Sequence, residues 1–250
     1  MDIKSFFEKH GETALAFSGG VDSSVLLALS KKYAKRVKAY YVKSQFQPRF
    51  ELDDALETAE KLGAELEVIE LDVLGFNEII NNPPDRCYYC KKAIFGEILK
   101  HAKRDGFGVI IEGTNASDDI SDRPGYKALG ELEVLSPLKF CGYTKADIRR
   151  TAAEFGLSVA DKPSYACLAT RIPTGTVITD GLLKKTEAAE NGLRALGFRN
   201  FRVRYKNGGA GLEFGKTDFE LYYKSEDEVQ NVLSPYYDKI TLDLKERPDE

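Results

Sequence analysis

Residues 18–24, Ser-Gly-Gly-Val-Asp-Ser-Ser, gather hydroxyl, carboxylate and glycine residues in one short stretch near the N-terminus. Apolar residues 14–17 precede it and apolar residues 25–29 follow it, which predicts a strand that turns into a helix. A helix start offers backbone N–H groups and the positive end of the helix dipole, and glycines let an anion approach closely. Asp22 adds an oxygen ligand of the kind that Mg²⁺ prefers. The stretch predicts a phosphate site with candidate ligands Ser18, Gly19, Gly20, Asp22, Ser23 and Ser24.

The stretch lacks the Lys-Ser or Lys-Thr ending of the G-x-x-x-x-G-K-[ST] phosphate loop. It resembles the PP-loop signature of the ATP pyrophosphatase superfamily. That resemblance implies cleavage of ATP between the α and β phosphates, with pyrophosphate held in the loop and AMP passed to an acceptor. The alternative is a Gly/Ser-rich turn before a helix, with Asp22 as the N-cap instead of a Mg²⁺ ligand.

Three cysteines have a spacing that suits a metal centre. Cys87 and Cys90 form a C-x-x-C pair, and Cys167 lies in a later loop bounded by prolines. Three thiolates can hold a [4Fe–4S] cluster and leave one iron for an additional sulfide. A zinc site with a fourth ligand, a redox disulfide and unrelated thiols are the alternatives. Cys141 follows a predicted strand and is interpreted as an apolar residue outside the site.

Strand and helix patterns alternate through the first two thirds of the chain. This alternation predicts an α/β fold with a mostly parallel sheet, in which ligands bind beyond the carboxyl ends of the strands. The sequence 113–115 follows such an end, so Gly113, Thr114 and Asn115 are predicted to lie near the nucleotide, unless they form a plain turn. Strands are predicted at 14–17, 37–42, 66–71, 108–112 and 134–138, and helices at 3–10, 25–33, 50–62, 91–104 and 145–155.

The pattern changes after the loop at 158–176. A helix at 182–196, a hairpin around Asn207-Gly208-Gly209, helical turns at 218–233 and a last strand at 239–244 predict a smaller α+β domain with antiparallel strands. We therefore predict a parallel-sheet ATP pyrophosphatase domain at 1–175 and a C-terminal α+β domain at 176–250.

Composition narrows the class of protein. The chain has 250 residues, 42% of them hydrophobic and 30% charged, with a net charge of −4 that argues against nucleic acid as a partner. The N-terminus lacks the apolar region of a signal peptide, and no run is long enough to span a membrane. The four cysteines do not follow a secreted disulfide pattern. We expect a cytoplasmic protein without a membrane partner.

The chain also resembles the LarE family, the sulfur transferases that mature the nickel-pincer cofactor of lactate racemase. The resemblance covers nearly the whole length and rests on residues 18–24, 112–115, 187–190 and 196–204, and above all on the Pro-Ser-Tyr-Ala-Cys-Leu-Ala-Thr-Arg-Ile-Pro stretch at 163–173. It implies that ATP adenylylates a carboxylate of a pyridinium-3,5-dicarboxylate mononucleotide. Sulfur then displaces AMP to give a thiocarboxylate, and the second carboxylate is treated likewise.

Members of this family differ in their source of sulfur. In one group the cysteine that matches Cys167 gives up its own sulfur, and those members lack cysteines at the positions of Cys87 and Cys90. A second group has all three and is taken to bind a [4Fe–4S] cluster that carries the sulfur. The resemblance thus places this chain in the cluster group, supplied by sulfide or a sulfur-donor system, and implies a homo-oligomer, possibly a hexamer.

Four further residues are assigned on the same basis. Arg171, Arg202 and Arg204 have forked donors that suit substrate phosphate or carboxylates, although a solvated sheet face explains the alternation of Arg202 and Arg204 equally well. Glu190 matches an acidic family position near the sulfur site, with an exposed helical carboxylate as the alternative. Two other functions stay open, namely a PP-loop tRNA thiolase with a three-cysteine cluster and a nucleotide-binding module with structural zinc.

Overall fold

The structure is a computed structural model that describes residues 1–119, 124–160, 162 and 165–247. The chain divides into two compact units, one formed by 1–73 and 85–162 and the other by 74–84 and 163–250. The sequence placed the domain boundary at 175/176, whereas the compact units divide after Lys162 and assign residues 74–84 to the second unit.

A parallel sheet forms the centre of the first unit. Its strand order is β3-β2-β1-β4, and every neighbouring pair is parallel. The predicted α/β fold with a parallel sheet is confirmed. The strands are β1 (Glu12–Ala16), β2 (Arg36–Lys43), β3 (Leu66–Glu70) and β4 (Ile110–Ile111).

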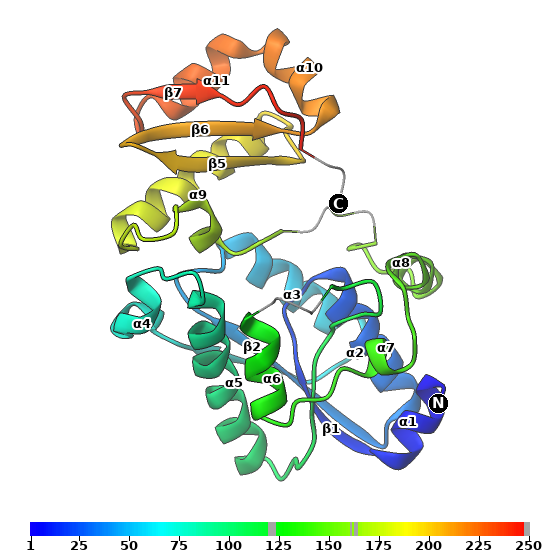
Figure 1. The fold of residues 1–250 in the computed structure, drawn as a ribbon. Helices are drawn as coiled ribbons and strands as arrows, with labels where there is room; N and C mark the ends of the chain where they lie inside the picture. Colours follow the sequence, from blue (N-terminus) through cyan, green and yellow to red (C-terminus); the bar gives the residue numbers. More distant parts are fainter. Residues whose placement is uncertain (120–123, 161, 163–164, 248–250) are drawn as a thin grey trace. The chain divides into compact units, whose positions relative to one another are not determined.

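Helices cover both faces of this sheet because side chains alternate along its strands. Leu15 and Tyr41 pack in one apolar core with helices α1, α2, α3 and α8, while Ala14 and Tyr40 pack in another with α5 and α6 (Figure 1). The helices of this unit are α1 (Ile3–Lys9), α2 (Val21–Tyr33), α3 (Arg49–Lys61), α5 (Arg86–Arg104), α6 (Pro124–Glu131), α7 (Pro137–Phe140) and α8 (Lys145–Glu154).

Two sequence predictions in this unit were wrong. The strand expected at 134–138 is reduced to a single parallel bridge between Leu135 and Ile111, because Pro137 has no N–H for a sheet and instead starts α7. The helix expected from residue 91 begins at Arg86, so that Cys87 and Cys90 lie inside its first turns.

The second unit contains a three-stranded sheet of order β5-β6-β7. Strands β5 (Phe201–Lys206) and β6 (Gly209–Phe214) form the predicted hairpin, and Asn207 and Gly208 both have positive φ, as a type I′ turn requires. Strand β7 (Ile240–Leu242) pairs parallel to β6, contrary to the antiparallel arrangement expected. The other elements are η1 (Val73–Gly75), α4 (Asn77–Ile80), η2 (Leu168–Arg171), α9 (Asp180–Ala195), α10 (Lys216–Lys224) and α11 (Glu226–Leu233).

Residues 74–84 belong to the second unit through hydrogen bonds to the segment 172–178. Buried Asn82 donates through Nδ2 to the carbonyl oxygens of Ile172 and Pro173, and its own carbonyl accepts from the N–H of Gly175. The amide of Ile178 donates to Ile80 in the same way. The chain therefore passes between the units at 73/74, 84/85 and 162/163.

Candidate functional site

The stretch 18–24 joins β1 to α2, as its pattern predicted. Gly20 is the N-cap of α2 and makes no side-chain capping bond, so the N-cap alternative for Asp22 is wrong. The hydroxyl of Ser23 donates to the carbonyl of Gly20 at 3.0 Å and accepts from the N–H of Ser18 at 3.3 Å. These bonds hold the backbone of the loop around the start of α2, where the dipole favours an anion.

Glycine is required at two positions around this loop. Gly19 has a φ of +77°, and a Cβ there would approach the carbonyl oxygen of Glu51 to 3.1 Å. A Cβ on Gly113 would lie only 2.9 Å from the backbone nitrogen of Ser23. The turn after β4 therefore packs directly against the first turn of α2.

Two side chains hold the carboxylate of Asp22. Asn115 donates through Nδ2 to Oδ1 at 3.0 Å, and Lys145 donates through Nζ to Oδ2 at 2.6 Å. The Asn115 prediction thus acquires a contact with the loop. Sequence reasoning missed Lys145; the available signal was a lysine at the first position of a predicted helix, where the dipole disfavours a cation.

Thr114 lies in the same turn, but its hydroxyl bonds elsewhere. It donates to Glu112 Oε2 at 2.7 Å, and Ser136 donates to Glu112 Oε1 at 2.5 Å. Glu112 is buried, so this pair of donors satisfies its carboxylate and fixes the course of the turn.

Cys87 and Cys90 lie at the N-terminal end of α5. A spacing of three places both on one side of the helix, and the dipole there favours thiolates. Arg86 donates to Cys87 Sγ at 3.9 Å, which supports an anionic sulfur. By contrast, burial raises the pKa of Cys141, which packs against the apolar core and suits the role of an apolar residue. All four cysteines are thiols and not disulfides.

Cys167 lies in the second unit, at the start of η2. Its carbonyl oxygen accepts from the Thr170 hydroxyl at 2.8 Å and from Arg171 Nη1 at 3.4 Å, and Nη1 also donates to the Ala166 carbonyl at 2.6 Å. The guanidinium of Arg171 therefore fixes the backbone on both sides of the Ala166–Cys167 peptide.

The same guanidinium forms a fully buried ion pair with Glu190 of α9. Arg171 Nε and Nη2 donate to the two oxygens of Glu190 at 2.8 and 3.0 Å, and Tyr165 donates its hydroxyl to Oε2 at 2.5 Å. Burial opposes the charge on Glu190, but the bonds and charge of Arg171 outweigh it and lower the pKa of the carboxyl. Burial, followed by the Glu190 charge, raises the pKa of Tyr165. The exposed-carboxylate alternative for Glu190 is wrong, and Arg171 is engaged inside the unit.

The two arginines of β5 have different surroundings. Arg202 is 6% exposed, and burial together with repulsion from Arg171 and Arg247 lowers its pKa to about 10. A solvated sheet face therefore does not describe Arg202. Arg204 bonds to Glu213 and donates through Nη1 to the Thr170 carbonyl at 2.6 Å, next to the Cys167 turn.

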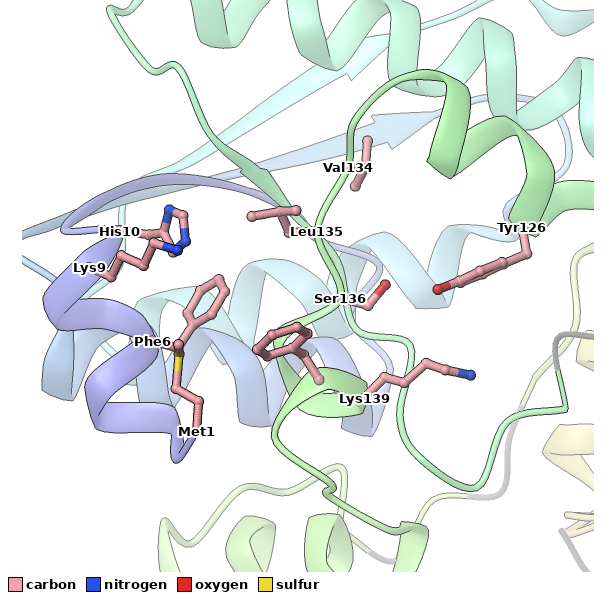
Figure 2. Close-up of a pocket in the computed structure, with 10 residues that line it drawn as sticks. Met1, Phe6, Lys9, His10, Tyr126, Val134, Leu135, Ser136 and Lys139 are labelled. Carbon is pink, nitrogen blue, oxygen red and sulfur yellow. The ribbon is translucent and has the colours of Figure 1, made fainter.

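A cavity of about 620 Å³ lies elsewhere in the first unit (Figure 2). It is lined by α1, α7, α6 and the segment around Leu135, with Phe6, His10, Tyr126, Ser136 and Lys139 among its residues. The described residues that line it include none of those predicted to bind ligand. The bond from Ser136 to Glu112 links this cavity to the turn after β4.

Within the described part of the chain, no group of three or more His, Cys, Asp or Glu side chains is arranged to hold a metal ion. Mg²⁺ commonly takes one or two carboxylates and completes its shell with phosphate oxygens and water, so Asp22 fits as one ligand. Cys87 and Cys90 fit as two thiolate ligands on one helix face, and Cys167 belongs to the other unit. No helix in the described ranges is long and apolar enough to cross a membrane.

Comparisons with known proteins extend over both units. A family model described as asparagine synthase matches residues 8–127. Pyridinium-3,5-bisthiocarboxylic acid mononucleotide synthase of Lactiplantibacillus plantarum is 34% identical over 92% of this chain and 84% of its own length. The chain belongs to this LarE family of ATP-dependent sulfur transferases.

Other relatives agree with LarE membership. An uncharacterised protein of Methanocaldococcus jannaschii is 34% identical over 95% of the chain and 91% of its own length. The tRNA-specific 2-thiouridylase of Thermotoga petrophila is 27% identical over 60% of the chain, which spans about half the length of that relative. The LarE match thus covers the second unit as well as the nucleotide unit, and the expected enzyme class and ATP pyrophosphatase fold are confirmed.

Proposed function

We propose that this protein uses ATP to convert the carboxylates of pyridinium-3,5-dicarboxylate mononucleotide to thiocarboxylates, a step in nickel-pincer cofactor synthesis. The observation that supports this substrate is the 34% identity to the L. plantarum synthase over 92% of the chain. Sulfide or a sulfur-donor system supplies the sulfur. The protein acts as a homo-oligomer, which light scattering on the purified protein tests.

In the ATP step, residues 18–24 hold the phosphates that leave as pyrophosphate. A substrate carboxylate oxygen attacks the α-phosphorus, the bond from that phosphorus to the bridging oxygen breaks, and pyrophosphate departs with the electron pair. Ser18, Ser23 and Ser24 donate hydrogen bonds, and Gly19 and Gly20 admit the phosphate to the backbone. Asp22 is a ligand of Mg²⁺, which offsets phosphate charge. Gly113, Thr114 and Asn115 border the nucleotide, with Asn115 orienting Asp22.

In the sulfur step, a sulfur nucleophile attacks the carbonyl carbon of the acyl-adenylate, and the bond to the AMP oxygen breaks. Cys87, Cys90 and Cys167 are the ligands of a [4Fe–4S] cluster, which when bound supplies transferable sulfur on its remaining iron. Support comes from the two cysteines on one face of α5 and from the tightly bonded backbone around Cys167. Cys167 serves as a ligand here and keeps its sulfur.

The arginines and Glu190 divide into two roles. Arg171 and Glu190 are positioning residues, because their atoms bond to each other and to the Cys167 turn. Arg202 and Arg204 contact substrate oxyanions. Burial that lowers the pKa of Arg202 supports this role, since a nearby anion would stabilise its charge.

The ATP step is tested by AMP and pyrophosphate release with and without the pyridinium substrate. We expect release that requires the substrate. Release in its absence at an equal rate contradicts an acyl-adenylate mechanism.

The cluster is tested by anaerobic purification followed by iron, sulfide and zinc analysis. We expect iron and sulfide in the protein, and their loss in Cys87→Ala, Cys90→Ala and Cys167→Ala variants that still bind ATP. Stoichiometric zinc without iron contradicts the cluster.

A tRNA thiolase is the second candidate, favoured by the match to the 2-thiouridylase of T. petrophila. The net charge of −4 argues against it, because binding to a polyanion draws on an excess of positive charge. A salt-dependent shift of tRNA, together with no response to the pyridinium substrate, would reverse the ranking.

A further inference from the structure

Lys145 occupies a position that helix stability does not explain. It is the first residue of α8, where its charge faces the positive end of the helix dipole. The helix start is already satisfied by a capping box, in which Thr144 and Asp147 exchange hydrogen bonds. The lysine therefore contributes something other than a cap.

The contacts of Lys145 lead to the phosphate loop. Its Nζ donates to Asp22 Oδ2, and its backbone N–H donates to the Ser117 hydroxyl at 3.0 Å. The amide of Ser117 donates to Asn115 Oδ1 at 2.8 Å, and Asn115 in turn bonds to Asp22. This closed ring of bonds fixes the start of α8 against the start of α2.

The ion pair is partly open to solvent. The side chain of Lys145 is 32% exposed and that of Asp22 is 27% exposed, so a ligand can reach the ammonium group. Ion pairs with such access contribute little to stability, and exchanging the partner costs little. A polyphosphate carries more negative charge than one carboxylate and lies at the same helix end.

We propose that Lys145 is a catalytic residue of the ATP step, whose ammonium leaves Asp22 and pairs with the departing pyrophosphate. This inference rests on the proposed function. Lys145 transfers no proton, and its charge offsets the negative charge that accumulates on pyrophosphate as the bond to the α-phosphorus breaks. Asp22 keeps its bond to Asn115, and the oxygen that Lys145 vacates becomes available to a cation.

Pyrophosphate affinity tests this assignment without any sulfur chemistry. Calorimetry would measure binding of inorganic pyrophosphate with Mg²⁺, and separately of AMP, to the full chain and to Lys145→Met and Lys145→Arg. Arg150→Met is the matched control, because it removes an ion pair of the same 2.6 Å length, to Asp147, from the same helix. Urea denaturation of each variant checks the fold.

We expect Lys145→Met to weaken pyrophosphate binding by about tenfold or more and to slow AMP formation by about 100-fold, with AMP affinity unchanged. Lys145→Arg should recover most of the affinity, and Arg150→Met should match the wild type. Equal pyrophosphate affinity in Lys145→Met, or an equal loss for AMP, overturns the assignment. A wild-type protein that binds no pyrophosphate overturns the proposed ATP step itself.

Discussion

At the residue scale, ion pairs within each unit shape the surroundings of the predicted site. Arg171 and Glu190 have side chains that are 0% and 1% exposed. Removing one member of such a pair leaves an uncompensated buried charge, which is more costly than the pair is worth. Because Arg171 also bonds to the carbonyls of Ala166 and Cys167, damage to the pair reaches the sulfur-bearing turn.

Glu190→Gln should therefore destabilise the protein by about 3–5 kcal/mol. The amide would keep the shape of the side chain but leave Arg171 without its counter-charge. Urea denaturation measures the change, and Asp180→Asn is the control because it removes an exposed pair with Lys184 that is worth about 0–1 kcal/mol. Similar losses in the two variants would show that the buried pair has no special weight.

A second charged cluster, in the first unit, makes stability depend on pH. Burial opposes the charge on Glu67, but bonds from Lys38, Arg104 and His101 outweigh it and lower the pKa to about 2 from the ordinary 4.5. The folded state then binds fewer protons than the unfolded state. The stabilisation is complete above about pH 4.5 and is lost as the pH falls toward 2.

Glu67→Gln should remove this part of the acid sensitivity. The urea midpoint of the wild type should fall more steeply between about pH 4.5 and about pH 3 than that of the variant, since only the wild type gains a proton at Glu67 on unfolding. Parallel slopes in the two proteins would contradict the assigned cause.

At the element scale, the site depends on the close approach of the turn after β4 to the first turn of α2. Gly113 permits this approach, because an added Cβ would lie 2.9 Å from the nitrogen of Ser23. Backbone cannot yield as a flexible side chain does, so the turn itself must move, and Asn115 moves with it.

Gly113→Ala should destabilise the protein by about 1–3 kcal/mol and weaken pyrophosphate binding. Gly130→Ala in α6 is the matched control, since its added Cβ meets no atom within 4 Å, and we expect unchanged binding there. Denaturation and calorimetry measure both effects. Unchanged binding in Gly113→Ala would show that the turn does not shape the phosphate site.

How far the sequence predicted these elements follows from the range of the signals. The parallel sheet and the loop at 18–24 follow local patterns, apolar periodicity and paired glycines, and both were correct. The start of α5 was placed too late, because polar residues around Cys87 hide the helix from a periodicity argument. Lys145 and the Arg171–Glu190 pair depend on contacts between distant segments, which no local pattern contains.

At the scale of the whole molecule, the proposed chemistry draws on both units. The phosphate loop, Cys87 and Cys90 belong to the first unit, while Cys167, Arg171, Glu190, Arg202 and Arg204 belong to the second. The chain enters the first unit shortly before Cys87 and the second shortly before Cys167. The LarE match covers both units, which supports a single function that needs both.

The central claim is ATP-dependent sulfur transfer to the pyridinium mononucleotide without loss of sulfur from Cys167. The most direct measurement is mass spectrometry of both substrate and protein after several turnovers of the anaerobically purified enzyme with ATP, Mg²⁺ and sulfide. We predict that oxygen is replaced by sulfur in the substrate carboxylates and that the mass of the protein is unchanged. A protein lighter by one sulfur, with dehydroalanine at position 167, or AMP formation without any thiocarboxylate, would contradict it.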